Sequence, residues 1–252
     1  MGCARARPVT NAAPSASAKR CHDRARAPSW INHAAFWPFW FGVRIVLRLL
    51  FRLRVENRPK LRGGYVIAAN HSSFLDPVLL GAASTRRITF LMTEVVYRSP
   101  KMHWFYRWNH AIPLATRGGN REGLREARSV LRQQRLVGIF PEGGLTRDGG
   151  LLLGSPGAVS LVLNEGLPIV PVGIVGAAAA LPLGAALPRL HPVTIRFGEP
   201  IMPAQLEALS QGDRKARLQA ATAYIMARIG ERTGQLPRER EQQAESAAVA
   251  KP

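Results

Sequence analysis

The stretch Tyr65-Val-Ile-Ala-Ala-Asn70-His71-Ser-Ser-Phe-Leu-Asp76-Pro77 joins a short apolar run to a polar loop and a helix start. An uninterrupted apolar run of this length is typical of a strand buried on both faces of a sheet. A proline directly after an aspartate is typical of the first turn of a helix. The same succession recurs along the chain, which predicts an α/β layered domain with a largely parallel or mixed sheet flanked by helices.

Further apolar runs of strand length lie at residues 88–92, 136–140, 169–175 and 193–197. Helical patterns lie between or after them, at residues 77–83, 120–134, 155–164 and 213–233, with a short helix candidate at 203–209. In open α/β sheets, ligands bind beyond the carboxyl ends of the strands. The polar residues that follow the runs 65–69 and 136–140 are therefore candidates for a site.

His71 and Asp76 stand five positions apart in the loop after the first of these runs. At this spacing a carboxylate can turn back on the imidazole, fix its tautomer and stabilise its protonated form. The free ring nitrogen can then take a proton from an alcohol. The competing interpretation is structural, because Asp76 before Pro77 is also an ordinary helix N-cap. The spacing alone leaves both interpretations open.

A glycine-rich loop follows the run that ends at Phe140, and it reads Pro141-Glu142-Gly143-Gly144-Leu-Thr-Arg147-Asp-Gly149. The backbone amides of such a loop can approach an anion closely because side chains do not intervene. The structural alternative is a plain turn, since Asp-Gly is a common hairpin signal.

Four motifs in order resemble those of the PlsC-type glycerophospholipid acyltransferases, the 1-acylglycerol-3-phosphate O-acyltransferase family. The family's first motif, His and then Asp after an Asn, is matched by Asn70, His71 and Asp76. The strand end Ile112-Pro-Leu-Ala-Thr-Arg117 approximates the second motif. The third is matched by Phe140-Pro-Glu142-Gly143, and the fourth, an apolar Pro-rich strand, by residues 167–172.

This resemblance implies an enzyme that moves a fatty acyl group from acyl-CoA or acyl-carrier protein to the hydroxyl of 1-acylglycerol-3-phosphate, giving phosphatidate. It implies that His71 is the general base, that Asp76 orients it, and that the alcohol attacks the thioester without an acyl-enzyme. The thioester is a substrate, so no cofactor is expected. The residues implied to bind the acceptor are Asn70, Arg117, Glu142, Gly143, Gly144 and Arg147.

The third motif departs from the family pattern, in which Thr-Arg follows Glu-Gly. Here Gly144-Leu145 occupies those two places and the arginine comes two positions later, as Arg147. Either Arg147 substitutes through loop geometry, or the acceptor is another lysolipid or a different hydroxylated or aminated lipid. Lysophosphatidate is the leading acceptor, because Arg117 is present and a guanidinium can bind phosphate oxygens in bidentate fashion.

The formal net charge of +19 indicates an anionic partner. Charge alone does not identify it, because anionic lipid surfaces, acidic carrier proteins and nucleic acids all gain from the same attraction. Residues 30–54 begin with many aromatic residues and then place Arg44, Arg48 and Arg52 on one helical face. This pattern is typical of a helix lying in the membrane interface, and the alternative is a core helix with a solvated arginine edge. We expect the protein at the cytoplasmic face of a membrane that contains anionic lipids.

Four segments are expected: a disordered basic leader (1–29), the membrane-associating amphipathic helix (30–54), the acyltransferase domain (55–235) and a disordered tail (236–252). Both cysteines lie in the leader, and the sequence lacks metal-site and nucleophile-elbow signatures, so neither a disulfide nor a metal is expected. The arginines of residues 121–135 are not interleaved with aromatic residues, which argues against a nucleic-acid partner. A non-catalytic basic lipid- or nucleic-acid-binding protein is the alternative from a different class.

Overall fold

The computed structural model describes residues 29–115, 120–146, 148–209 and 212–239. The chain divides into two units, residues 1–38 and residues 39–252, and the sheet lies entirely in the second. Helix α2 (Ser29–Phe51) crosses this boundary, so only its residues 39–51 are described together with the sheet. Residues 1–28 of the expected leader lie outside the described residues.

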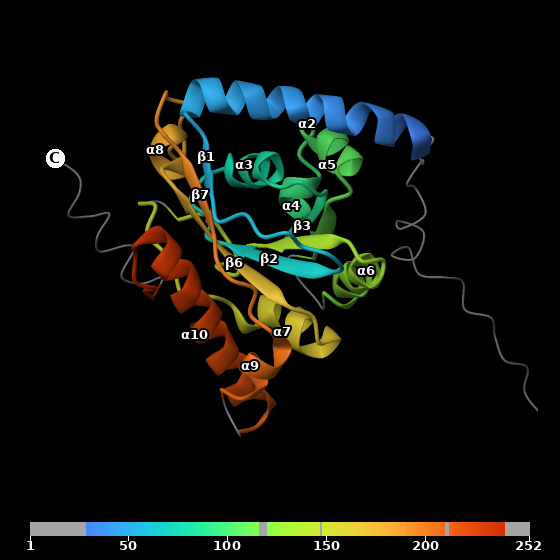
Figure 1. Cartoon of the computed structure of the whole chain (residues 1–252), viewed down its shortest axis with the longest axis vertical. Helices are drawn as coiled ribbons and strands as arrows, with labels where there is room; N and C mark the ends of the chain where they lie inside the picture. The colour runs from blue at the N-terminus through green and yellow to red at the C-terminus, as the bar shows by residue number, and fades with distance from the viewer. Residues whose placement is uncertain (1–28, 116–119, 147, 210–211, 240–252) are drawn as a thin grey trace, which may run out of the picture. The chain divides into compact units, whose positions relative to one another are not determined.

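A seven-stranded sheet in the order β1-β7-β6-β2-β5-β3-β4 forms the centre of the second unit (Figure 1). Its strands are β1 (Arg54–Glu56), β2 (Tyr65–Ala69), β3 (Ile88–Thr93), β4 (Ile112–Leu114), β5 (Leu136–Ile139), β6 (Ile169–Val175) and β7 (Thr194–Phe197). All neighbours are parallel except β6 and β7, which are antiparallel. The expected α/β fold with a mixed, largely parallel sheet is confirmed.

Helices cover both faces of this sheet. The helices after α2 are α3 (Asp76–Ala83), α4 (Glu94–Tyr97), α5 (His103–Trp108), α6 (Arg121–Arg132), α7 (Pro156–Glu165), α8 (Ala177–Ala180), α9 (Pro203–Glu207) and α10 (Arg214–Thr233). Figure 1 shows α7, α9 and α10 on one side of the sheet and α3 on the other. Buried side chains from α6, α7, α9 and α10 pack with those of β2, β5 and β6 into one continuous core.

Residues 39–51 of α2 contact α3 and the residue after it through Trp40 and Arg44. Trp40, Leu47 and Phe51 are buried, and the Trp40 ring lies directly against Gly81, where a Cβ atom would collide with it. Arg44 donates from Nε to the carbonyl of Ala82 at 2.7 Å and from Nη2 to that of Ser84 at 2.9 Å. A cation at the carboxyl end of a helix is favoured by the helix dipole and by the unpaired carbonyls there.

Several elements differ from the sequence-based expectation. The N-terminal helix ends at Phe51 rather than at residue 54, where β1 begins. Arg44, expected on a basic face with Arg48 and Arg52, instead binds the end of α3. Residues 236–239, expected in a disordered tail, are described, and Arg238 forms a β-bridge with Leu152. None of the helices within the described ranges is long and apolar enough to span a bilayer.

Candidate active site

The site lies where two neighbouring parallel strands end. Ala68 of β2 is paired with Ile139 of β5, so His71 and Glu142, each three residues further on, leave the sheet at the same level. Figure 1 shows β2 in the middle of the sheet. Because β2 is hydrogen-bonded to both β5 and β6, side chains in the loop after it can reach either neighbour.

His71 and Asp76 form the expected pair. The His71 Nδ1–H donates to Asp76 Oδ2 at 2.9 Å, and the same oxygen accepts the backbone N–H groups of Ser72 at 2.7 Å and Ser73 at 2.8 Å. Asp76 is the first residue of α3, and its carboxylate faces back along the loop rather than capping the helix that it begins. The N-cap interpretation is therefore wrong.

Burial and hydrogen bonding act in opposite directions on Asp76, whose side chain is fully buried. Burial raises the pKa of the Asp76 carboxyl, whereas the hydrogen bond and charge of His71 and the amides of Ser73 and Ser72 lower it, and burial is the largest effect. A buried carboxylate is stabilised when its partner carries the opposite charge. Asp76 therefore orients the imidazole through its hydrogen bond to Nδ1, which is the part that the carboxylate of a His–Asp pair takes.

The His71 ring is held in place but remains accessible. It stacks on the Phe140 ring with a centroid separation of 4.1 Å and an interplanar angle of 17°, and Phe90 stacks in turn on Phe140. The His71 side chain is 18% exposed. Since Nδ1 carries the hydrogen donated to Asp76, Nε2 of the neutral ring is the unprotonated nitrogen. Nε2 is thus available to accept a proton.

The Glu142 side chain links the two loops by accepting hydrogen bonds from backbone N–H groups. Its side chain is buried, its Oε1 accepts the N–H of His71 at 2.6 Å, and its Oε2 accepts the N–H of Leu152 at 3.0 Å. Gly143 has φ +72°, a left-handed conformation that a side chain would strain, although the space around its Cα is open. The glycine thus turns the chain sharply after a fixed carboxylate.

Asn70 ties the loop to the strand on its other side. It is buried, its Nδ2 donates to the carbonyl of Ile174 at 2.9 Å, and its Oδ1 accepts the N–H of Ile174 at 2.7 Å. Asn70 thereby satisfies both backbone groups of one β6 residue. The side chains of Asn70 and Glu142 fix the His71 loop from β6 and from the glycine-rich loop respectively.

The two extra residues of the glycine-rich loop are accommodated locally. Gly144 and Leu145 are half-buried, and the chain returns to the site at Thr146, whose N–H donates to the carbonyl of His71 at 3.2 Å. The Thr146 side chain is buried, and its hydroxyl has no hydrogen-bond partner among the described residues. Arg117 and Arg147, the expected phosphate ligands, lie outside the described residues.

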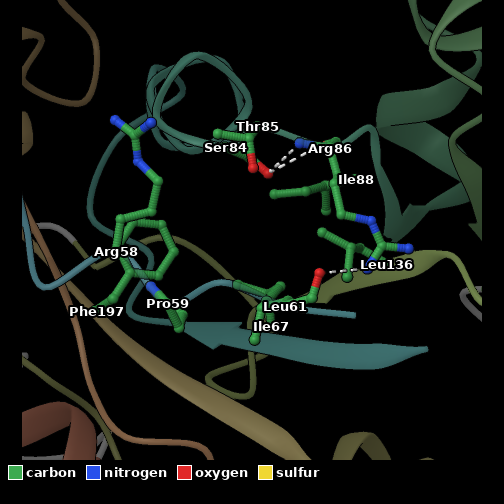
Figure 2. A pocket seen from close by; sticks show the side chains of 10 residues that line it. All are labelled: Arg58, Pro59, Leu61, Ile67, Ser84, Thr85, Arg86, Ile88, Leu136 and Phe197. Carbon is green, nitrogen blue, oxygen red and sulfur yellow. Dashed lines mark hydrogen bonds between the residues drawn. The ribbon is translucent and has the colours of Figure 1, made fainter. Parts of the chain in front are cut away.

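A separate pocket lies at the end of the sheet where strands β3 and β5 begin. Figure 2 shows its lining residues, which are Arg58, Pro59, Leu61, Ile67, Ser84, Thr85, Arg86, Ile88, Leu136 and Phe197. Ile88 and Leu136 are the first residues of β3 and β5, whereas the site follows strand carboxyl ends. Arg86 donates to the carbonyls of Gly63 and Gln134. The pocket is separate from the site around His71, and Arg86, one of its two arginines, joins neighbouring loops.

The sequence did not predict the contact between the chain after α10 and the glycine-rich loop. Residues 235–238, after α10, run beside residues 148–153 of the glycine-rich loop. The pairing joins segments that are far apart in sequence, and neither carries strand periodicity. Among the described residues, no cluster of three His, Cys, Asp or Glu side chains is placed to hold a metal ion.

Known proteins resemble this chain in both sequence and fold. The sequence profile of the family described as Acyltransferase matches residues 52–175. The 1-acyl-sn-glycerol-3-phosphate acyltransferase of Bacillus subtilis is 26% identical over 193 residues, which cover 75% of this chain and 92% of that protein. The enzyme of the same name from Limnanthes alba is 30% identical over 150 residues, covering 58% of this chain and 52% of that protein.

Among solved structures, the 1-acyl-sn-glycerophosphate acyltransferase PlsC from Thermotoga maritima has a TM-score of 0.63 to this chain. The alignment covers 82% of this chain and 83% of that one, at 22% sequence identity. This likeness shows a shared fold.

Proposed function

The chain belongs to the PlsC-type glycerophospholipid acyltransferases, and from this premise we propose that it acylates the free hydroxyl of 1-acylglycerol-3-phosphate, giving phosphatidate. The observation that carries the proposal is the His71–Asp76 pair. Its imidazole is oriented by a buried carboxylate at 2.9 Å, and its side chain is 18% exposed. We propose acyl-CoA or acyl-carrier protein as the donor, since either supplies a thioester that the deprotonated hydroxyl can attack.

The proposed reaction is a direct transfer. The acceptor hydroxyl attacks the thioester carbonyl carbon while its proton passes to Nε2 of His71. The tetrahedral intermediate collapses, the carbon–sulfur bond breaks, and the imidazolium returns the proton to the leaving thiolate. Asp76 stabilises the imidazolium between these two transfers. The products are the acylated lipid and a free thiol, and no bond between protein and acyl group forms.

We assign acceptor binding to the loop that begins at Gly143. Its backbone can approach a headgroup phosphate because Gly143 and Gly144 carry no side chains. Arg117 and Arg147 are the proposed guanidinium ligands of that phosphate. Asn70 and Glu142, which the resemblance implies as acceptor ligands, hold the His71 loop through the hydrogen bonds described above, and we propose a positioning role for both.

We further propose that α2 rests on the cytoplasmic face of a membrane with anionic lipids. Within residues 39–51, large apolar side chains outside the buried stripe are exposed, namely Phe39, Phe41, Ile45, Val46, Leu49 and Leu50. Trp104 of α5 is 64% exposed, and the neighbouring Trp108 packs on Phe39. A contiguous apolar surface of this kind marks an interaction site. Exposed Arg48 lies beside it and suits anionic headgroups.

One assay tests the proposed reaction. Membranes containing the protein are incubated with labelled acyl-CoA, or labelled acyl-carrier protein, and a panel of lysolipids. We expect label in phosphatidate, and a loss of roughly 10²–10⁴-fold with His71→Ala, the range for a general base. His103→Ala is the matched control, because His103 Nδ1 bonds the carbonyl of Tyr97 away from the dyad.

The panel also separates the possible acceptors. Because Gly144-Leu145 displaces the arginine of the third motif, a different lysolipid remains an alternative acceptor. Label appearing only in another lipid, and lost with His71→Ala, would replace lysophosphatidate as acceptor. Undiminished incorporation in the His71→Ala protein would reject the proposed chemistry.

A further inference from the structure

The chain beyond α10 turns back and pairs with the glycine-rich loop. Gly234, in the left-handed conformation, ends the helix. Four residues later the N–H of Arg238 donates to the carbonyl of Leu151 at 3.0 Å, and the carbonyl of Arg238 accepts the N–H of Leu153 at 2.8 Å. These two bonds form a short parallel bridge centred on Leu152.

Side chains extend this contact. The guanidinium of Arg238 forms an ion pair with Asp148, and the amide of Gln235 donates to the carbonyl of Gly149 at 3.2 Å. Gly150 lies so close to the guanidinium that a Cβ atom at this position would require the Arg238 side chain to shift. Residues 148–153 are thus held along their length by residues 235–238.

The residue at the centre of the bridge contacts the site. The N–H of Leu152 donates to Oε2 of Glu142 at 3.0 Å, and Oε1 of Glu142 accepts the N–H of His71 at 2.6 Å. Both carboxylate oxygens of a buried glutamate are therefore used to join Leu152 to His71. A shift of Leu152 must displace Glu142 or break one of these bonds, and an unpaired buried carboxylate oxygen is costly.

We infer that Arg238 is a positioning residue for the catalytic histidine, acting through Leu152 and Glu142. The inference rests on the proposed function for its catalytic part. Arg238 sets the position of residues 148–153, these set Glu142, and Glu142 fixes the main chain that carries the imidazole. Small displacements of a catalytic group lower the rate steeply, because reactant and base must meet in a narrow range of geometries.

The test uses the full-length protein and three substitutions at one position. Arg238→Ala removes the ion pair, Arg238→Pro also removes the N–H that bonds Leu151, and Arg238→Lys keeps the charge. Arg228→Ala is the matched control, because Arg228 also forms an ion pair, with Glu231 on the exposed face of α10. Two quantities are measured for each protein: kcat and acceptor KM, and the hydrogen-exchange rates of the His71 and Leu152 amides.

We expect kcat to fall roughly tenfold or more in Arg238→Ala and further in Arg238→Pro, with the acceptor KM within about twofold. Arg238→Lys should recover part of kcat. Amide exchange should accelerate at both Leu152 and His71 in the Ala and Pro proteins and stay unchanged in Arg228→Ala. The partial recovery of kcat in Arg238→Lys and the faster amide exchange at His71 would distinguish a positioning role from a general loss of stability.

Three results would overturn the inference. They are an unchanged kcat in both Arg238→Ala and Arg238→Pro, faster exchange at Leu152 without any change at His71, and an equal loss of kcat in Arg228→Ala. The exchange measurement does not depend on the reaction. If the parent protein fails to make phosphatidate while His71 exchange still responds to Arg238, the proposed function fails and the physical coupling stands.

Discussion

The main-chain N–H of His71 donates to Oε1 of Glu142 at 2.6 Å, across the gap between two neighbouring strand ends. The carboxylate that opens the glycine-rich loop thus acts on the backbone of the dyad histidine. Its second oxygen accepts from Leu152. Glu142 therefore determines how the β2 and β5 loops are placed relative to each other.

Glu142→Gln should lower both activity and stability. A glutamine has one acceptor oxygen, so one of the two N–H groups, of His71 or Leu152, would face an NH₂ group. We expect the free energy of unfolding to fall by about 1–3 kcal/mol, the cost of an unsatisfied buried donor. Denaturant unfolding and kcat measure the two effects. Parent-like values of both would contradict the role given to Glu142.

Asp76→Asn should lower kcat and should raise the stability of the protein relative to the parent as pH increases. Burial raises the pKa of Asp76, so the stability linked to this carboxyl is fully present below its ordinary pKa of about 3.9 and is lost as pH rises through the raised pKa. Asparagine does not ionise, so the unfolding free energy of the variant relative to the parent should increase with pH.

The same Asp76→Asn protein should be strongly impaired in kcat, because a neutral amide cannot stabilise the imidazolium. The measurements are denaturant unfolding between about pH 3 and pH 8 and kcat at neutral pH. A stability difference that is constant with pH would show that Asp76 does not titrate as its burial implies.

Asn70→Ala should destabilise the protein more than an ordinary surface change. It would leave the buried N–H and C=O of Ile174 without the partners that Asn70 now provides. We expect a loss of about 1–3 kcal/mol, measured by denaturant unfolding. Asn109→Ala is the matched control, because Asn109 makes one side-chain bond to the carbonyl of Phe105 in its own helix turn. Equal losses in the two proteins would argue against a special role for Asn70.

Membrane binding should depend on α2 in two separable ways. Phe41→Ser with Leu49→Ser should weaken cosedimentation with both neutral and anionic vesicles, because both exposed side chains lose apolar area available for burial. Arg48→Ala should weaken binding to anionic vesicles alone, by about 1 kcal/mol. The control is Leu187→Ser, an exposed leucine in the loop after α8. Binding that is indifferent to both α2 changes would exclude this surface as the membrane contact.

The central strands were predictable because their burial is complete. The runs at β2, β5 and β6 are apolar throughout, since both faces of the sheet are covered there. Strand β1 was missed because it has three residues, none of them buried, and two are charged. This edge segment is a strand because its backbone pairs with the backbone of β7, and its side-chain pattern contributes little.

The dyad was predictable from spacing, and its supports were not. His71 and Asp76 are close in sequence, so the local chain brings them together. The contacts of Glu142 depend on the register of β2 against β5, and those of Asn70 on β6, which begins about a hundred residues later. The family resemblance implied that both residues bind the acceptor, and nothing in the sequence indicated that their side chains also bond backbone groups of distant segments.

Helix α3 gives the proposed membrane contact a geometric consequence. Its first residue supplies the dyad carboxylate, and the carbonyls at its other end are held by Arg44 of α2. Eight residues of helix extend about 12 Å, and α2 itself lies between α3 and the exposed apolar side chains that we place on the lipid. A lysolipid would therefore have to rise partly out of the bilayer to bring its hydroxyl to His71, and how far each lipid can rise would help to determine which lipids are acylated.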